Sequence, residues 1–101
     1  MRTLVAAVAL IALAAGCGGQ SHTASRRQLR EGRALFTRSC SDCHTLTGHD
    51  THAAGGDLAT ATLDVADLTS FVRVMPVRLS SAQVRAIAAY VHAATQWNAK
   101  R

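Results

Sequence analysis

The sequence predicts a small all-α domain. Three stretches carry apolar residues at helical spacing behind a capping residue, and no segment alternates convincingly between apolar and polar residues with a period of two. The chain has 101 residues, of which 49% are hydrophobic but only 4% are aromatic. One domain of this length has little side-chain bulk for a core, and such small domains commonly need a staple or a bound group.

The charge balance limits the classes of partner. Eleven lysine and arginine residues stand against six aspartate and glutamate residues, which gives a formal charge of +5. This modest excess suits an acidic partner or an anionic membrane surface better than sequence-specific nucleic-acid binding, so no nucleic-acid partner is expected. The three cysteines are an odd number, which excludes a disulfide framework that uses all of them.

The first segment has the pattern of an export signal. Arg2 precedes an apolar run from Leu4 to Ala15, which is typical of a secretory signal peptide, here over residues 1–16. The run is too short to cross a bilayer stably, because a spanning helix needs ~20 apolar residues. We therefore predict an extracytoplasmic protein, on the periplasmic or cell-envelope side of the membrane.

Small residues directly before Cys17 resemble a bacterial lipobox, in which the cysteine receives a diacylglycerol thioether and becomes the new N-terminus. Two acyl chains are enough for stable attachment, so Cys17 is predicted to anchor the protein to the membrane as a lipoprotein. Residues 17–24 are then a lipid-anchored tether, and residues 25–101 form the folded domain. The alternative is an ordinary signal peptide with an incidental cysteine.

The first helix is predicted near residues 26–39. Ser25 begins a Ser-x-x-Gln capping box with Gln28, in which the hydroxyl and the amide satisfy free backbone donors. Apolar residues then recur at helical spacing. Residues 45–60 contain three glycines and two histidines without sustained periodicity, so this stretch is predicted to be a loop.

Two further helices follow the loop. Asp64 is the predicted cap of the second helix, which ends by Val74 because a proline follows two residues later. Ser80 and Gln83 form another capping box, and the third helix runs from there to about residue 97.

A compact motif stands at the end of the first predicted helix, where the chain reads Cys40-Ser41-Asp42-Cys43-His44. Cys-x-x-Cys-His is the attachment signal for c-type haem. Two thiols three residues apart on one helical turn can reach both vinyl groups of a single porphyrin, and the histidine that follows is directed at the iron. The motif therefore predicts one covalently attached haem.

Three other interpretations of the cysteine pair compete with this one. A thioredoxin-like redox pair needs a βαβ pattern, which the chain lacks. Cys40 and Cys43 could instead hold zinc together with His49 and His52, because two sulfurs and two imidazoles suit a tetrahedral site. That site would leave His44 without a role. A chance occurrence of the motif is the remaining alternative.

Met75 is the candidate for the second axial ligand of the iron. It lies 31 residues after His44, directly before the only proline and past the second predicted helix. A thioether is a neutral ligand that favours ferrous iron and raises the reduction potential. The alternative is that Met75 fills the core. The rival ligands are the histidines outside the motif: His49, His52 and His92.

Over residues 25–97 the chain resembles the class I c-type cytochromes, which are small monohaem electron carriers. The resemblance rests on the Cys-x-x-Cys-His motif and on the methionine before the single proline. It implies a small cytochrome c fold, in which about three main helices pack around one covalently bound haem c with its iron. Cys40 and Cys43 then attach the haem, while His44 and Met75 are the axial ligands.

The resemblance extends to helix packing. In the family, a glycine and an aromatic residue on the first helix pack against an aromatic residue on the last, where the two helices cross near a right angle. Gly32 and Phe36 match the first pair, and Tyr90 matches the last residue. Gly32 is expected where the helices approach so closely that only a hydrogen fits.

The family also carries a Gly-Pro-x-Leu stretch beneath the ligating histidine, in which the proline carbonyl accepts the second N–H of the imidazole. Gly55-Gly56-Asp57-Leu58 stands in the matching place, with Gly56 where the proline is expected. The resemblance implies that the Gly56 carbonyl accepts this hydrogen bond from His44. The missing ring leaves the loop less rigid.

These residues predict an electron carrier in a respiratory chain rather than an enzyme, with no catalytic residues. Two occupied axial positions leave no open site on the iron, so one electron is transferred without a change of ligands. Arg73 and Arg78 flank Met75 and are candidates for contact with an acidic patch on a redox protein partner. We expect a monomer. The alternatives are a haem-based sensor or redox-enzyme module in which Met75 is displaced, and a zinc or dithiol protein.

Overall fold

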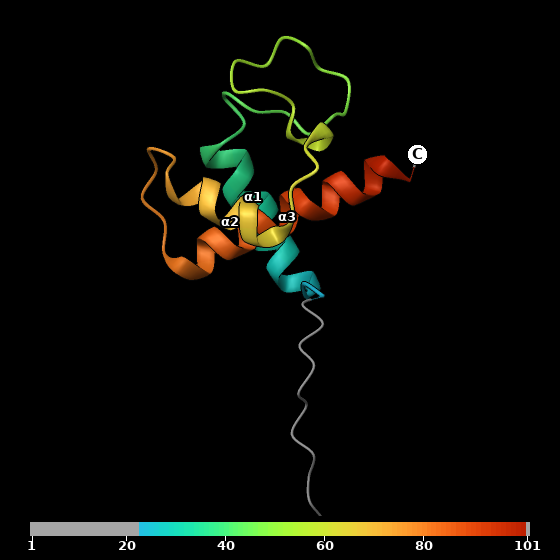
Figure 1. The fold of residues 1–101 in the computed structure, drawn as a ribbon. Helices are drawn as coiled ribbons and strands as arrows, with labels where there is room; N and C mark the ends of the chain where they lie inside the picture. Colours follow the sequence, from blue (N-terminus) through green and yellow to red (C-terminus); the bar gives the residue numbers. More distant parts are fainter. Residues whose placement is uncertain (1–22, 101) are drawn as a thin grey trace, which may run out of the picture.

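The computed structural model describes residues 23–100. The predicted signal peptide and Cys17 lie outside these residues. The chain forms helix α1 over Arg26–Ser39, a 3-10 turn η1 over Leu58–Thr60, helix α2 over Val65–Arg73 and helix α3 over Ser81–Ala99 (Figure 1). Within residues 23–100 the only β-type pairing is an isolated parallel bridge between Thr45 and Asp57. The all-α prediction is confirmed.

Each predicted cap is present. The hydroxyl of Ser25 accepts a hydrogen bond from the Gln28 amide at 3.1 Å, which is one half of the predicted capping box. Ser80 and Gln83 make both halves, at 3.2 Å and 2.9 Å. These bonds satisfy amides that have no partner inside the helix, and they explain why both helices begin where the sequence predicts.

The remaining boundaries differ little from the prediction. Asp64 caps α2 by accepting from the Asp67 amide at 2.8 Å. α3 ends at Ala99, slightly beyond the predicted end near residue 97. The predicted loop over residues 45–60 holds, except that its last three residues form η1. None of the helices described over residues 23–100 combines the length and apolar character that crossing a membrane requires.

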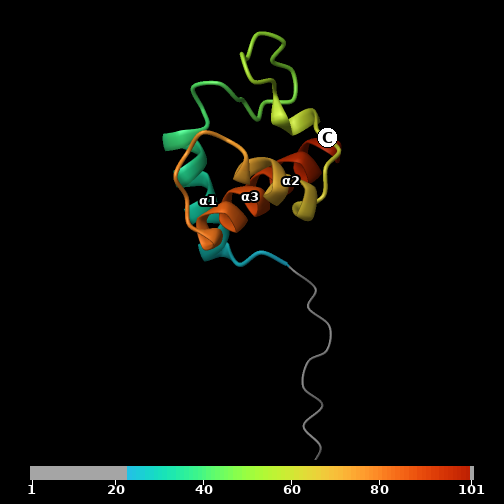
Figure 2. The ribbon, with the colours of Figure 1, turned by 60° about the vertical axis from the view of Figure 1, so that its left-hand side comes forward.

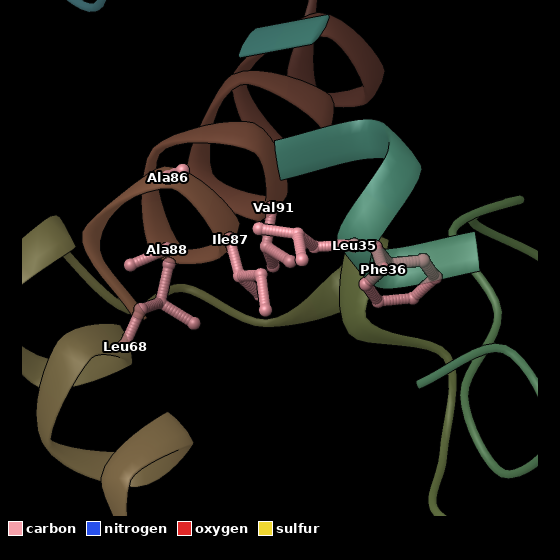
Figure 3. Packing of buried hydrophobic residues seen from close by; sticks show 7 residues of the cluster. All are labelled: Leu35, Phe36, Leu68, Ala86, Ile87, Ala88 and Val91. Atoms are coloured by element: carbon pink, nitrogen blue, oxygen red, sulfur yellow. The ribbon is translucent and has the colours of Figure 1, made fainter. Parts of the chain in front are cut away.

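Helix α3 is the centre of the fold. α1, α2 and η1 all contact it, and Figures 1 and 2 show α1 and α2 packed along its N-terminal half. Figure 3 shows the side chains of Ile87 and Val91 on α3 pointing toward Leu35 on α1, while Leu68 of α2 approaches Ala88. The buried cluster consists of Leu35, Phe36, Leu68, Ala86, Ile87, Ala88 and Val91.

The crossing of α1 and α3 depends on Gly32. A Cβ atom at Gly32 would lie only 2.7 Å from the carbonyl carbon of Ala86 and 2.8 Å from the Cβ of Tyr90. One turn further along α1, the ring of Phe36 packs against the ring of Tyr90, with centroids 5.8 Å apart and planes tilted by 59°. The glycine and aromatic contact that the resemblance implies is therefore present.

Candidate functional site

The Cys-x-x-Cys-His motif continues directly from the C-terminal end of α1. The amide of Cys40 donates to the Phe36 carbonyl at 2.8 Å. The amides of Cys43 and His44 both donate to the Cys40 carbonyl, at 3.2 Å and 3.0 Å. This single turn carries both thiols and the imidazole on one short piece of backbone, anchored to a buried residue of the core.

The two thiols differ in their surroundings. Both cysteines are free, with Cys40 half-buried and Cys43 exposed. Cys40 packs against the buried core cluster, as does Val72 in the last turn of α2. Burial raises the pKa of the Cys40 thiol because the thiolate loses solvation there. The motif therefore combines one accessible thiol with one at the edge of the core.

The imidazole of His44 has a defined orientation. Its Nδ1 lies 3.3 Å from the carbonyl oxygen of Gly56. Because a carbonyl oxygen can only accept, Nδ1 is the donor in this contact, and in the neutral imidazole Nε2 then carries the lone pair that a metal can bind. A Cβ at Gly55 would lie 2.8 Å from His44 Nδ1, so only a glycine lets the backbone approach the ring. The hydrogen bond that the resemblance implies for Gly56 is confirmed.

Backbone hydrogen bonds join the segment around Gly56 to the end of the Cys-x-x-Cys-His motif. The Gly55 amide donates to the Cys43 carbonyl at 2.6 Å, and the Leu58 amide donates to the Thr45 carbonyl at 2.9 Å. The Thr45 amide donates to the Gly56 carbonyl at 3.4 Å. The two segments therefore meet as a short parallel pair, and this pairing places the Gly56 carbonyl beside His44.

The backbone conformation at position 56 explains why a glycine stands there. Its φ is +90°, and no atom lies within 4 Å of the position that a Cβ would take. The constraint is therefore the left-handed conformation and not lack of space. A proline, whose φ is held near about −65°, has no access to this conformation. The proline that the family resemblance implies at this position would therefore not fit this backbone turn.

Asp57 has a role that the sequence analysis did not predict. Burial opposes the ionisation of its carboxyl group, but hydrogen bonds from the Asp50 backbone, the Thr47 hydroxyl and the backbones of Ala59 and Gly48 outweigh it, and they lower the pKa of Asp57 to about 2. An aspartate before a short turn is the available sequence signal. That pattern is too common in loops to identify such a group by itself.

Met75 lies in the turn that follows α2. Its amide donates to the Val72 carbonyl at 3.2 Å, and its carbonyl accepts from the Val77 amide at 2.8 Å. In Figures 1 and 2 the connection from α2 to α3 runs beside the C-terminal end of α1. The pairing of Met75 with His44 on one iron stays a prediction.

Apolar side chains are exposed at this end of α2. Phe71 is 54% exposed, Val74 is 73% exposed and Met75 is 40% exposed. Large apolar side chains grouped in one short segment are typical of a surface that contacts another apolar group. The exposure of Met75 also argues against the alternative in which it fills the core.

Two of the rival histidines, His49 and His92, have a backbone carbonyl next to their Nδ1. His49 Nδ1 lies 3.1 Å from the Thr47 carbonyl within the exposed loop, and His52 is exposed in the same loop. His92 on α3 is half-buried, with Nδ1 3.3 Å from the Leu63 carbonyl. In the part of the chain that the structure describes, no three His, Cys, Asp or Glu side chains gather as a metal site would require.

The residues present fit a covalently attached haem. Two free thiols stand on one turn, the adjacent imidazole keeps its Nε2 lone pair free, and apolar side chains are exposed at the end of α2. Haem c, when bound, supplies a one-electron ferric/ferrous couple. Carbonyl hydrogen bonding to the second nitrogen is the usual means of orienting a ligating imidazole.

Comparison with known protein families matches residues 27–91, more than half of the chain, with the family described as cytochrome c oxidase, cbb3-type, subunit III. No curated protein and no solved structure matches the chain. The matched domains bind haem c and its iron covalently and serve in haem-based electron transfer with redox protein partners, generally on the extracytoplasmic side. The chain therefore belongs to this family of c-type cytochrome domains.

Proposed function

We propose that this chain is a monohaem electron carrier in which Cys40 and Cys43 form the thioether bonds and His44 and Met75 are the axial ligands. It carries one electron at a time between partners of a respiratory chain and catalyses no reaction of its own. The observation that carries the proposal is the hydrogen bond from His44 Nδ1 to the Gly56 carbonyl. His44 lies on the same turn as the two free thiols of Cys40 and Cys43.

The attachment chemistry follows from the thiols. Each S–H group adds across one vinyl group: an S–C bond forms, the S–H bond breaks, and the hydrogen goes to the neighbouring vinyl carbon. The addition consumes an S–H group and involves no net oxidation or reduction. Both cysteines must therefore be present as thiols when they react. The free state of Cys40 and Cys43 supports this step, because a disulfide between them would block it.

The two axial ligands have complementary roles. The bond from Nδ1 to a carbonyl makes the His44 imidazole more basic and fixes its ring orientation. The thioether of Met75 is neutral and favours the ferrous state. With both residues bound, His44 and Met75 would hold the iron in both oxidation states and would leave no site for another ligand, which would keep reorganisation small.

The domain organisation and location are part of the proposal. Residues 1–16 are a signal peptide, residues 17–24 are a tether with a lipidated Cys17, and residues 25–101 are the cytochrome c domain. The carrier is a monomer held at the outer side of the membrane. Arg73 and Arg78, which are exposed on either side of Met75, are the proposed contacts for an acidic partner surface.

Covalent attachment is tested by expressing the full chain in a host able to mature c-type cytochromes. The denatured protein is expected to keep its Soret absorbance and to have the mass of the polypeptide plus one haem. Replacing both Cys40 and Cys43 by serine abolishes both signals, while His49→Ala, in the same region but outside the motif, preserves them. A wild-type protein with the mass of the bare polypeptide contradicts the proposal.

A further inference from the structure

The side chain of Asp57 accepts hydrogen bonds from several residues of the loop that contains the Gly56 carbonyl. Oδ2 of Asp57 accepts from the Thr47 hydroxyl at 2.8 Å and from the Asp50 amide at 3.0 Å. Its Oδ1 accepts from the Ala59 amide at 3.0 Å. Thr47 and Asp50 lie in the outgoing part of the loop, and Ala59 lies in the returning part. The half-buried carboxylate of Asp57 therefore ties both parts of the loop together.

Asp57 is also directly connected to the histidine. It follows Gly56 in the chain and forms the isolated parallel bridge with Thr45, which in turn follows His44. The Gly56 carbonyl accepts from Thr45 at 3.4 Å and lies 3.3 Å from His44 Nδ1. Movement of Asp57 therefore moves the acceptor of the His44 proton.

Gly56 is held only through its backbone, since its amide donates to the Ala53 carbonyl at 3.0 Å and its carbonyl accepts from the Thr45 amide at 3.4 Å. It has no side chain, its φ is +90°, and the space where a Cβ would stand is empty out to 4 Å. A glycine in this setting has the largest conformational freedom to lose. The order of the segment must come from its neighbours, and the Asp57 carboxylate accepts three of the hydrogen bonds that supply it.

We propose that Asp57 is a positioning residue for the axial histidine: its carboxylate holds the Gly56 carbonyl against Nδ1 of His44 and thereby sets the orientation and basicity of the imidazole. This inference rests on the proposed role of His44 as an iron ligand. A hydrogen-bonded imidazole is the stronger donor and stabilises ferric iron more. Loss of the hydrogen bonds to the Asp57 carboxylate is therefore expected to raise the reduction potential.

The test compares Asp57→Ala with Asp64→Ala in the full-length holo-protein. Asp64 is a matched control, because its carboxylate also caps a helical element, accepting from the Asp67 amide at 2.8 Å, but on α2 and away from the His44 loop. Solvent exchange of the His44 Nδ1 proton is measured by NMR on the reduced protein, and the reduction potential is measured by spectroelectrochemistry.

In Asp57→Ala the Nδ1 proton is expected to exchange about tenfold faster than in Asp64→Ala, because loss of the hydrogen bonds to the carboxylate shifts the local opening equilibrium. The potential rises relative to the same control. If the Nδ1 proton of Asp57→Ala exchanges at the control rate, Asp57 does not position His44 and the inference is overturned.

Two milder variants test the inference if the Asp57→Ala protein does not fold. Asp57→Asn keeps one carbonyl oxygen as an acceptor. Thr47→Val removes the 2.8 Å bond to Oδ2, together with the 3.3 Å bond that the Thr47 hydroxyl accepts from the His49 amide, and leaves the other two bonds to Asp57 in place. Both are expected to give exchange rates between those of the wild type and Asp57→Ala. Unchanged exchange in both variants overturns the inference. Failure of the proposed function has a different signature, because the wild-type protein then holds no covalent haem.

Discussion

The backbone of Gly32 on α1 lies directly against the backbone of Ala86 on α3, with no room for a side chain between them. The carbonyl carbon of Ala86 would be 2.7 Å from a Cβ at position 32. Because this neighbour is backbone inside a long helix, it cannot rotate away as the end of a flexible side chain can. The closest approach of the two helices thus depends on one hydrogen atom.

Gly32→Ala is expected to force α1 and α3 apart and to lower the free energy of unfolding by about 1–3 kcal/mol, the usual cost of overpacking a core. The gain in helix propensity from glycine to alanine, about 1 kcal/mol, offsets only part of the cost of placing a Cβ against backbone atoms that cannot rotate away. Urea unfolding of the holo-protein measures the change. Arg33→Ala, at the exposed neighbouring position, is the control and stays near the wild-type value. Equal stability of Gly32→Ala and wild type contradicts the close crossing.

Substitutions at Gly56 distinguish two possible reasons for the glycine, the backbone conformation and the space available for a side chain. Since no atom lies within 4 Å of a Cβ there, size is irrelevant and the φ of +90° decides. Gly56→Asn is expected to cost least, Gly56→Ala about 1–2 kcal/mol, and Gly56→Pro the most. Thermal unfolding of the holo-proteins gives the order. A proline variant as stable as the wild type, as the family pattern by itself suggests, shows that the segment has a different backbone turn.

Asp57 produces a specific pH dependence. The pKa of its carboxyl group is lowered in the folded protein to about 2 from an ordinary value of 3.8. A lowered pKa means that the ionised form is bound more favourably in the folded state, so its stabilisation is fully present above about pH 4 and is lost as the pH falls toward 2.

The prediction is that wild type loses more stability than Asp57→Asn between about pH 4 and pH 2, because the variant has no such proton to take up. Urea unfolding at a series of pH values measures both slopes. Asp42→Asn, which removes an exposed carboxylate from the attachment turn, serves as the control and keeps the wild-type slope. Parallel slopes for wild type and Asp57→Asn refute the stabilising role of the ionised carboxylate.

Met75 is tested by replacing its thioether with an alkyl side chain of similar size. Met75→Leu is expected to lower the reduction potential, because the ligand that favours ferrous iron is lost. It also opens one axial position, so the reduced protein gains a spectral change with carbon monoxide. Val74→Leu, a neighbouring exposed change, should do neither.

The wild-type response to carbon monoxide separates the proposed carrier from the alternative. A carrier with both axial positions filled shows no spectral change with carbon monoxide. Binding by the wild-type protein instead favours a sensor or redox-enzyme module in which Met75, whose side chain is 40% exposed, is displaced from the iron.

Much of this protein was predictable because its main features are local in the chain. Ser25, Asp64 and Ser80 cap their helices through bonds to amides three residues away, so a short window of sequence contains both partners. The attachment motif is local for the same reason, since its five residues occupy one turn. The amphipathic spacing of the helices then determined that they pack on one another, and the all-α fold followed.

The loop over residues 45–60 was decided by tertiary structure, because its bonds join residues that the sequence separates. His44 and Gly56 lie 12 positions apart, and Thr47 and Asp57 lie 10 positions apart. Their pairing depends on a backbone turn in which Gly56 has a positive φ. The sequence shows that a glycine stands there, but it does not show which way the backbone turns. The cysteines and histidine of the motif are thus identifiable from sequence, whereas the orientation of the imidazole required the folded loop.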